Sequence, residues 1–209
     1  MTPPPEGIGG RADITAQMRM WMLQEAHEVR SAAERLERAG PAGAFGLLAG
    51  CPRLVAVTGV GTSGLVAAKL AATFTSSGTA ALFLHASDAL HGGLGIVGEA
   101  DVAIAVSKSG RTAETLLVVD ALRGAGVSVI ALTGTPDSPL ARTADAVLDA
   151  SVAAEACPLG ISATASSTVA LAMGHALAMT LATHRGWSLR DLARVHPAGA
   201  LGSLTREEL

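Results

Sequence analysis

The sequence predicts an α/β fold, a three-layer αβα sandwich around a five-stranded parallel sheet. From residue 53 onward, short apolar runs alternate with stretches of helical periodicity. The runs at 101–106 and 127–132 are almost wholly apolar, as is typical of central parallel strands that helices cover on both faces. Glycine- and serine-rich turns follow the first and third runs, where a strand of a doubly wound sheet passes into its helix.

The elements follow from this alternation in chain order. Residues 1–12 are expected to form a disordered lead, and a helix with apolar residues at helical spacing is expected from Asp13 to Leu36. Gly40 and Pro41 end this helix, which is expected to cover the sheet or to dock onto a neighbouring subunit. Strands are expected at 53–58, 79–84, 101–106, 127–132 and 145–150, with helices near 63–76, 112–125, 137–143 and 164–185.

Length and composition favour one globular domain, spanning 13–209. The chain has 209 residues, of which 49% are hydrophobic and 16% charged. A net charge of −3, no basic cluster and 2% aromatic residues argue against nucleic acid or an anionic membrane as a partner.

Targeting signals and membrane spans are not expected. The N-terminus lacks the pattern of a signal peptide, and the apolar stretch 168–183 is too short to span a bilayer. We expect that stretch to form a buried helix in which His175 is a satisfied core histidine. Cys51 and Cys157 lack metal-type spacing, so we expect reduced thiols and a cytoplasmic protein.

Two loops carry the strongest functional signal. The first is Gly59–Gly64 (GVGTSG) and the second is Ser107–Thr112 (SKSGRT), each directly after a strand. A glycine-rich turn that opens a helix offers free backbone N–H groups and the positive end of the helix dipole, which together hold an anion. Since ligands of such sheets bind beyond the carboxyl ends of the strands, the two loops predict a pocket for a phosphorylated small molecule.

Other phosphate-loop interpretations fit less well. The first loop matches G-x-G-x-x-G, but a dinucleotide site needs an acidic residue at the end of the next strand. Here that strand ends in His85, and Asp88 comes late. A Walker P-loop has no match. Ordinary tight turns remain an alternative for either loop alone.

Further segments carry a family resemblance. They are 85–95 (HASDALHGGLG), 133–140 (TGTPDSPL), 155–160 (EACPLG), 164–168 (TASST) and 196–202 (HPAGALG). With the two loops, they resemble the sugar isomerase (SIS) domain, and within it the arabinose-5-phosphate isomerase branch, over about 13–204. The segments 155–160 and 196–202 are the most specific. Many members continue into a pair of CBS domains, and we expect a form without them.

The resemblance implies a phosphate site between the two loops. The matching positions are Gly61, Thr62, Ser63, Ser107, Ser109, Gly110 and Thr112. An alternative is that Ser63 and Thr112 cap their helices, and both roles use the same geometry.

The resemblance also implies a reaction, the interconversion of D-arabinose 5-phosphate and D-ribulose 5-phosphate through an enediol, without metal or organic cofactor. Such chemistry needs a base and a donor for the developing oxyanion. His196 or Glu155 is the expected base, and His91 is expected to open the sugar or polarise an oxygen. The family places its site at a subunit boundary, so a homodimer or homotetramer is expected.

Two positions depart from the family pattern. Thr62 stands where lysine is usual, and Arg111 stands where glutamate is frequent. Arg111 is expected to act as a phosphate or oxyanion partner in place of the lysine. The departures are compatible with a changed sugar or with binding without turnover. The alternatives are therefore a non-catalytic sugar-phosphate sensor and a 6-phospho-3-hexuloisomerase, against which 155–160 and 196–202 argue.

Overall fold

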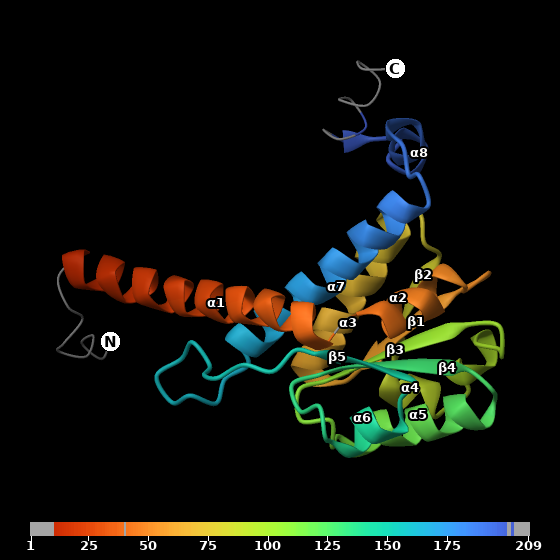
Figure 1. Ribbon diagram of the computed structural model, residues 1–209, viewed down its shortest axis with the longest axis horizontal. Helices are drawn as coiled ribbons and strands as arrows, with labels where there is room; N and C mark the ends of the chain where they lie inside the picture. The colour runs from red at the N-terminus through yellow and green to blue at the C-terminus, as the bar shows by residue number, and fades with distance from the viewer. Residues whose placement is uncertain (1–10, 40, 200–201, 203–209) are drawn as a thin grey trace, which may run out of the picture.

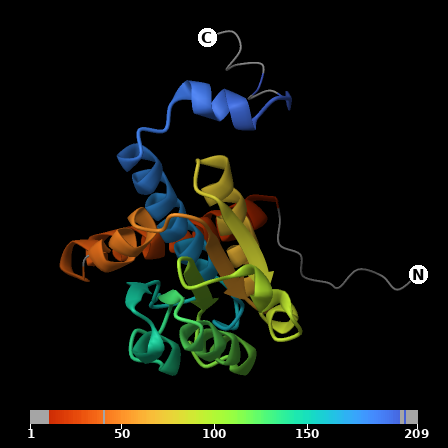
Figure 2. The same cartoon turned by 90° about the vertical axis from the view of Figure 1, so that its right-hand side faces the viewer.

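The computed structural model describes residues 11–39, 41–199 and 202. The expected lead at 1–12 therefore falls mostly outside the described residues, except that Arg11 and Ala12 already belong to the first helix. Figures 1 and 2 show a sheet with helices on both faces.

The sheet confirms the predicted fold class. All five strands run parallel in the order β2-β1-β3-β4-β5, with Val57 of β1 between Phe83 of β2 and Ile104 of β3. The predicted strands agree with the observed ones to within two residues, because each apolar run is bounded by turn residues. Their bounds are β1 Val55–Gly59, β2 Ala81–His85, β3 Val102–Ser107, β4 Ser128–Thr133 and β5 Ala146–Asp149.

Helices form a layer on each face of the sheet (Figure 1). One apolar cluster joins residues of α1, α2, α3 and α7 to one face of the strands, and a second cluster joins α4 and α5 to the other face together with Leu140 of α6. The bounds are α1 Arg11–Ala39, α2 Ala42–Ala49, α3 Gly61–Ser76, α4 Ala86–Ala89, α5 Ala113–Gly124, α6 Pro139–Thr143, α7 Ala165–His184 and α8 Leu189–Val195, with a 3₁₀ turn, η1, at Gly93–Ile96. The predictions missed α2, α4, η1 and α8, which are too short to show a helical period.

The apolar helix α7 is a core element. It is long and apolar enough to pass a test for membrane spans, yet over half of its apolar window is buried, as in the core helices of soluble domains. It packs on α3 where Gly174 meets Leu70, since a Cβ at Gly174 would lie 2.4 Å from Leu70 Cδ2. The prediction that His175 is a satisfied core histidine is wrong, because its Nε2 atom is buried and has no hydrogen-bond partner in the described part of the chain.

The first helix is tied to the body at its C-terminal half and projects from it at its N-terminal half (Figure 1). Glu28 is 1% exposed, and Arg35 forms an ion pair with Asp149 at the end of β5 (Nε–Oδ2 3.4 Å). In the projecting half, Met18 and Met22 are exposed. The C-terminal half of the helix therefore packs on α7 in the helical layer on one face of the sheet, and its N-terminal half leaves an apolar surface open.

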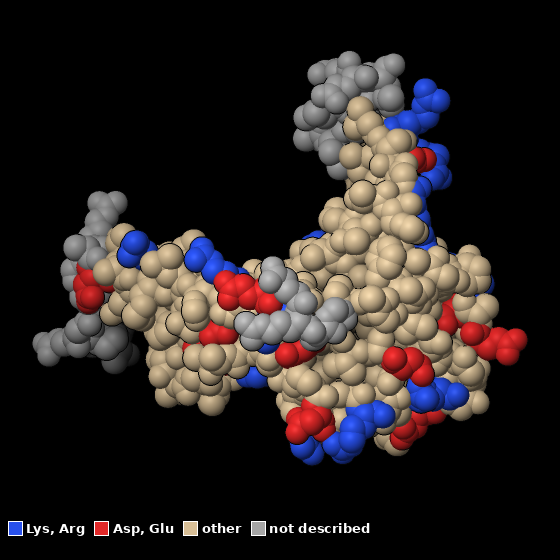
Figure 3. Space-filling view, viewed as in Figure 1, with Lys and Arg blue, Asp and Glu red and all other residues tan. Residues whose placement is uncertain are grey.

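Charge is mixed on the face seen in Figure 3. Acidic and basic side chains alternate along its lower rim, over α5 and α6, and much of the rest is uncharged. No patch of a single sign dominates this face.

Candidate functional site

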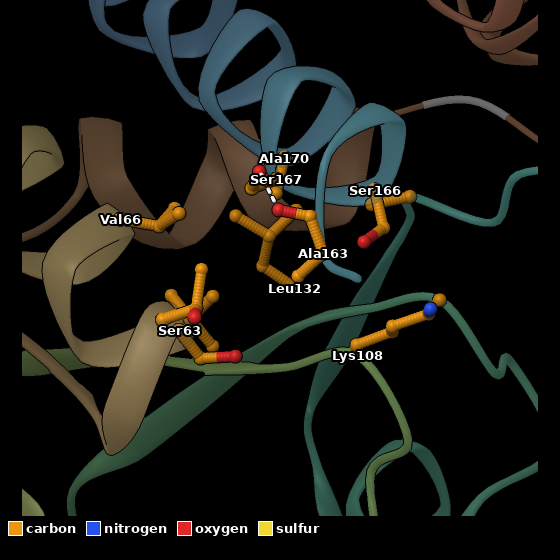
Figure 4. Close-up of a pocket in the computed structure, with 12 residues that line it drawn as sticks. Ser63, Val66, Lys108, Leu132, Ala163, Ser166, Ser167 and Ala170 are labelled. Atoms are coloured by element: carbon orange, nitrogen blue, oxygen red, sulfur yellow. Dashed lines mark hydrogen bonds between the residues drawn. The ribbon is translucent and has the colours of Figure 1, made fainter. Parts of the chain in front are cut away.

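The two predicted loops meet at one edge of the sheet. β1 and β3 are neighbours, so the turns after Gly59 and Ser107 leave adjacent strands at the same end. A narrow inner cavity of about 30 Å³ lies between them and opens beside a wider cleft of about 410 Å³. The inner cavity is lined by Thr62, Ser63, Val66, Val106, Lys108, Leu132, Gly134, Ala150, Ala163, Ser166, Ser167 and Ala170 (Figure 4).

The first loop presents an open helix N-terminus. α3 begins at Gly61 with φ +58°, and its first internal backbone bond runs from Gly64 N–H to the Val60 carbonyl (3.1 Å). Val60 is the N-cap and gives no side-chain bond, so the amides of Gly61, Thr62 and Ser63 lack helical acceptors. Ser63 does not cap the helix. It is half-buried and lines the cavity.

The second loop is held by its own hydroxyl groups. Ser107 Oγ accepts from Gly110 N–H (3.1 Å) and lies 3.1 Å from Thr112 Oγ1, so these hydroxyls shape the loop. Thr112 is the N-cap residue of α5 but makes no side-chain capping bond. Gly110 has φ +59°, and a Cβ there would lie 2.0 Å from Ser138 Oγ. Ser109 is exposed and lines the wider cleft.

Glu155 accepts five hydrogen bonds at the N-terminus of α7. Its Oε2 accepts from the Thr164 amide (3.0 Å), the Thr164 hydroxyl (3.2 Å) and the Ser166 amide (3.1 Å). Its Oε1 accepts from the Ser166 hydroxyl (2.5 Å) and from Lys108 Nζ. The buried carboxylate therefore occupies the positive end of this helix dipole.

These contacts decide the ionisation of Glu155. Burial raises the pKa of a carboxyl group, but the hydrogen bonds from Lys108, Ser166 and Thr164 outweigh burial and lower the pKa to about 2. At neutral pH Glu155 is therefore an ionised, buried anion that protein hydrogen-bond donors stabilise. In this arrangement it is a weak base.

Lys108 is the charged side chain among the residues that line the inner cavity. It also lines the wider cleft, and 47% of its side-chain surface is exposed, against 2% for Glu155. Figure 4 shows Lys108 extending toward the side of the cavity where Ser166 lies, with Ser63 on the α3 side. The ammonium group thus lies at the opposite end of the cavity from the open N-terminus of α3.

The segment before Glu155 is fixed by α1. Glu28 accepts from the amides of Ala153 (2.9 Å) and Ala154 (3.2 Å), and Arg35 donates to the Ser151 carbonyl (2.5 Å). A helix distant in sequence thereby holds the backbone that leads to the buried carboxylate of Glu155.

The other predicted catalytic residues lie elsewhere in this chain. Arg111 and His91 are exposed and do not line either cavity, although both follow strands that end at the same sheet edge. His196 lies with Val195 against the C-terminal half of α3 and β2, in a separate groove. Among the described residues, Glu155 reaches the cavity only through Lys108 and Ser166, which line it, and His196 lies in the separate groove.

Four residues that shape the site were not predicted from the sequence, namely Lys108, Thr164, Ser166 and Glu28. Lys108 stood within the second loop, and the segment 164–168 was already part of the resemblance, so both offered a signal. Glu28 offered none, because a single glutamate on a long helix is typical of a solvated face. Within the described residues there is no group of three His, Cys, Asp or Glu side chains that could hold a metal ion. The absence of a cofactor remains a prediction.

Comparisons with known proteins identify the family of this chain. Residues 48–180 match the SIS domain family. The chain is 47% identical over 156 residues to arabinose 5-phosphate isomerase KdsD of Pseudomonas aeruginosa, covering 75% of this chain and 48% of that protein. It is 44% identical over 178 residues to arabinose 5-phosphate isomerase GutQ of Salmonella typhi, covering 84% and 56%.

The chain spans about half the length of these curated relatives. A solved structure, c3406 of E. coli CFT073 in complex with A5P, superposes with a TM-score of 0.85 at 34% identity, covering 90% of this chain and all of that one. The sheet order, the paired loops and these matches lead to one conclusion: the chain belongs to the SIS domain family, in its arabinose-5-phosphate isomerase branch.

Proposed function

We propose that the protein is an isomerase that interconverts the aldose and ketose forms of a phosphorylated sugar through an enediol, without a metal or organic cofactor. D-arabinose 5-phosphate and D-ribulose 5-phosphate are the proposed pair. The observation that carries the proposal is the inner cavity between the two loops with the cleft beside it, where an open helix N-terminus lies at one end and Lys108, the ion-pair partner of Glu155, at the other. The relatives named for this reaction support it.

The two ends of the cavity suit the two ends of a sugar phosphate. The amides of Gly61, Thr62 and Ser63, with the hydroxyls of the latter two, form the anion site for the phosphoryl group. The carbon chain extends into the wider cleft past Ser109, toward Lys108.

We further propose that the site is completed in a homodimer or homotetramer. His196 lies outside the cavity of its own chain, and the exposed apolar residues of α1 leave a surface for a second copy. His196 and His91 are the residues proposed to supply proton transfer at that boundary. Both cysteines are free thiols, which supports a cytoplasmic protein.

The decisive experiment is NMR of the purified protein in D₂O with a panel of pentose, tetrose and hexulose phosphates. Deuterium entering C1 or C2 of one of them identifies the reaction and its substrate, while unphosphorylated D-arabinose serves as the negative substrate. Ser63→Ala is expected to raise KM about tenfold, since a hydrogen bond to a charged group is lost. Ser128→Ala, at the opposite edge of the sheet, is the matched control. An unchanged KM for Ser63→Ala contradicts the phosphate site.

A non-catalytic sugar-phosphate sensor is the second candidate. It is favoured by one observation: among the described residues, no carboxylate or histidine lines the cavity or the cleft, and Glu155, which pairs with Lys108, has a pKa of about 2. Tight binding of a sugar phosphate without any deuterium exchange would select the sensor.

A further inference from the structure

We infer that Lys108 contacts the reacting end of the substrate and that its ammonium group moves from Glu155 to the substrate oxygen that becomes negatively charged. The inference rests on the proposed isomerase function and names a residue for its electrostatic step. Three observations support it, namely the position of Lys108, its exposure and the other donors of its partner.

The position of Lys108 separates it from the phosphate end. Its side chain reaches toward the Ser166 side of the cavity, while the open amides of α3 lie on the Ser63 side (Figure 4). When the phosphoryl group is held at α3, the sugar carbons therefore extend toward Lys108. A compact ammonium group is a strong partner for a developing oxyanion in a partly dry cavity.

Glu155, the ion-pair partner of Lys108, does not need the lysine to keep its position. Glu155 keeps four other hydrogen bonds, two from Thr164 and two from Ser166, when the lysine leaves. The carboxylate stays bound at the α7 N-terminus in both states. Lys108 is half-exposed and has a flexible stem, so it can exchange one anionic partner for another at little cost.

Movement of Lys108 to the substrate also changes the pKa of Glu155. The hydrogen bond from Lys108 is the largest of the contributions that lower its pKa, after the opposing effect of burial. Departure of the ammonium group therefore raises the pKa of Glu155 from about 2. Binding of the substrate by Lys108 therefore makes Glu155 more basic than it is in the free protein.

The reaction balances without any further reactant. In the aldose, a base takes the C2 proton, the C2–H electron pair forms the C1=C2 double bond, and the C1 carbonyl electrons move onto O1, where Lys108 stabilises the negative charge. The base returns its proton to C1, the O2 proton moves to O1, and the C2=O2 carbonyl of the ketose forms.

The test compares Lys108→Met and Lys108→Arg with the wild type. Lys108→Met is expected to lower kcat about 100-fold or more while KM changes by less than about threefold, because the charge is needed only in the transition state. Lys108→Arg is expected to retain part of kcat. Lys69→Met is the control, since Lys69 lies on the exposed side of α3 and donates to Thr73 Oγ1 (2.7 Å).

A binding measurement separates this role from the proposed function. Calorimetry compares inorganic phosphate with the hydroxamate of 4-phospho-D-erythronic acid, whose planar O–C–N–O group resembles the enediolate. Lys108→Met is expected to lose at least about tenfold in affinity for the hydroxamate and to bind phosphate as the wild type does.

Other outcomes overturn the inference or separate it from the proposed function. A raised KM with weaker phosphate binding and an unchanged kcat assigns Lys108 to the phosphoryl group instead. If Lys108→Met leaves both kcat and the affinity for the hydroxamate unchanged, Lys108 does not contact the substrate. If the wild type binds the hydroxamate but exchanges no deuterium, the isomerase proposal is refuted. The affinity of Lys108→Met for the hydroxamate then still shows whether Lys108 contacts the ligand. A wild type that binds neither ligand refutes both.

Discussion

Replacing Glu155 by glutamine should remove a specific part of the pH dependence of stability. The pKa of this carboxyl falls from 4.5 to about 2 in the folded chain, because hydrogen bonds from Lys108, Ser166 and Thr164 outweigh the opposing effect of burial. A group with a depressed folded-state pKa stabilises the fold above its unfolded pKa, and that stability is lost as pH falls toward the folded value. The contribution at pH 7 is about 3 kcal/mol, of which about 2 kcal/mol is lost by pH 3.

The assay is urea unfolding at pH 7 and pH 3, followed by far-ultraviolet circular dichroism. The free energy of unfolding of the wild type is expected to fall by about 2 kcal/mol more over this interval than that of Glu155→Gln. Asp120→Asn, on the exposed side of α5, controls for the removal of any carboxylate. Equal losses in the wild type and Glu155→Gln would refute the idea that the α7 N-terminus holds an ionised Glu155.

Two further predictions concern the residues that shape the cavity. Gly110→Ala is expected to destabilise the fold by about 2 kcal/mol or more, since it combines a positive φ with a Cβ 2.0 Å from Ser138 Oγ. Gly124→Ala, which has open space at its Cβ, is the control, and equal melting temperatures for the two variants would contradict the argument. Glu28→Gln is expected to cost about 1–3 kcal/mol in urea unfolding and to lower kcat, because one of the two backbone amides before Glu155 loses its acceptor. An effect no larger than that of Glu34→Gln, on the exposed side of α1, would show that Glu28 positions nothing.

The fold could be predicted from the sequence because its signals are local. Each strand is an apolar run between turn residues, and each long helix has its own period and end signals, so no distant contact had to be known. The common edge of the two loops followed from the rule that parallel strands end on the same side. The short helices, such as Ala86–Ala89, form through packing and have no period of their own.

The site could be predicted only in part, because a sequence motif does not determine which way a hydroxyl group points. Ser107 and Thr112 stood in the expected loop, yet their oxygens lie 3.1 Å apart and serve the loop itself. Lys108 pairs with a residue 47 positions away, and Glu28 binds an amide 125 positions away. Such contacts depend on the packed structure, and a single sequence does not reveal them.

The occupied end of α7 has a consequence for any molecule that enters. This helix has its positive pole already neutralised by the chain's own carboxylate, while α3 keeps an unfilled pole a short way across the cavity. A ligand with a dianionic group at one end and an uncharged chain at the other is stabilised electrostatically when the dianionic group faces α3. It lacks this stabilisation when the dianionic group faces α7. The protein therefore imposes a polarity on its guest before any chemical step begins.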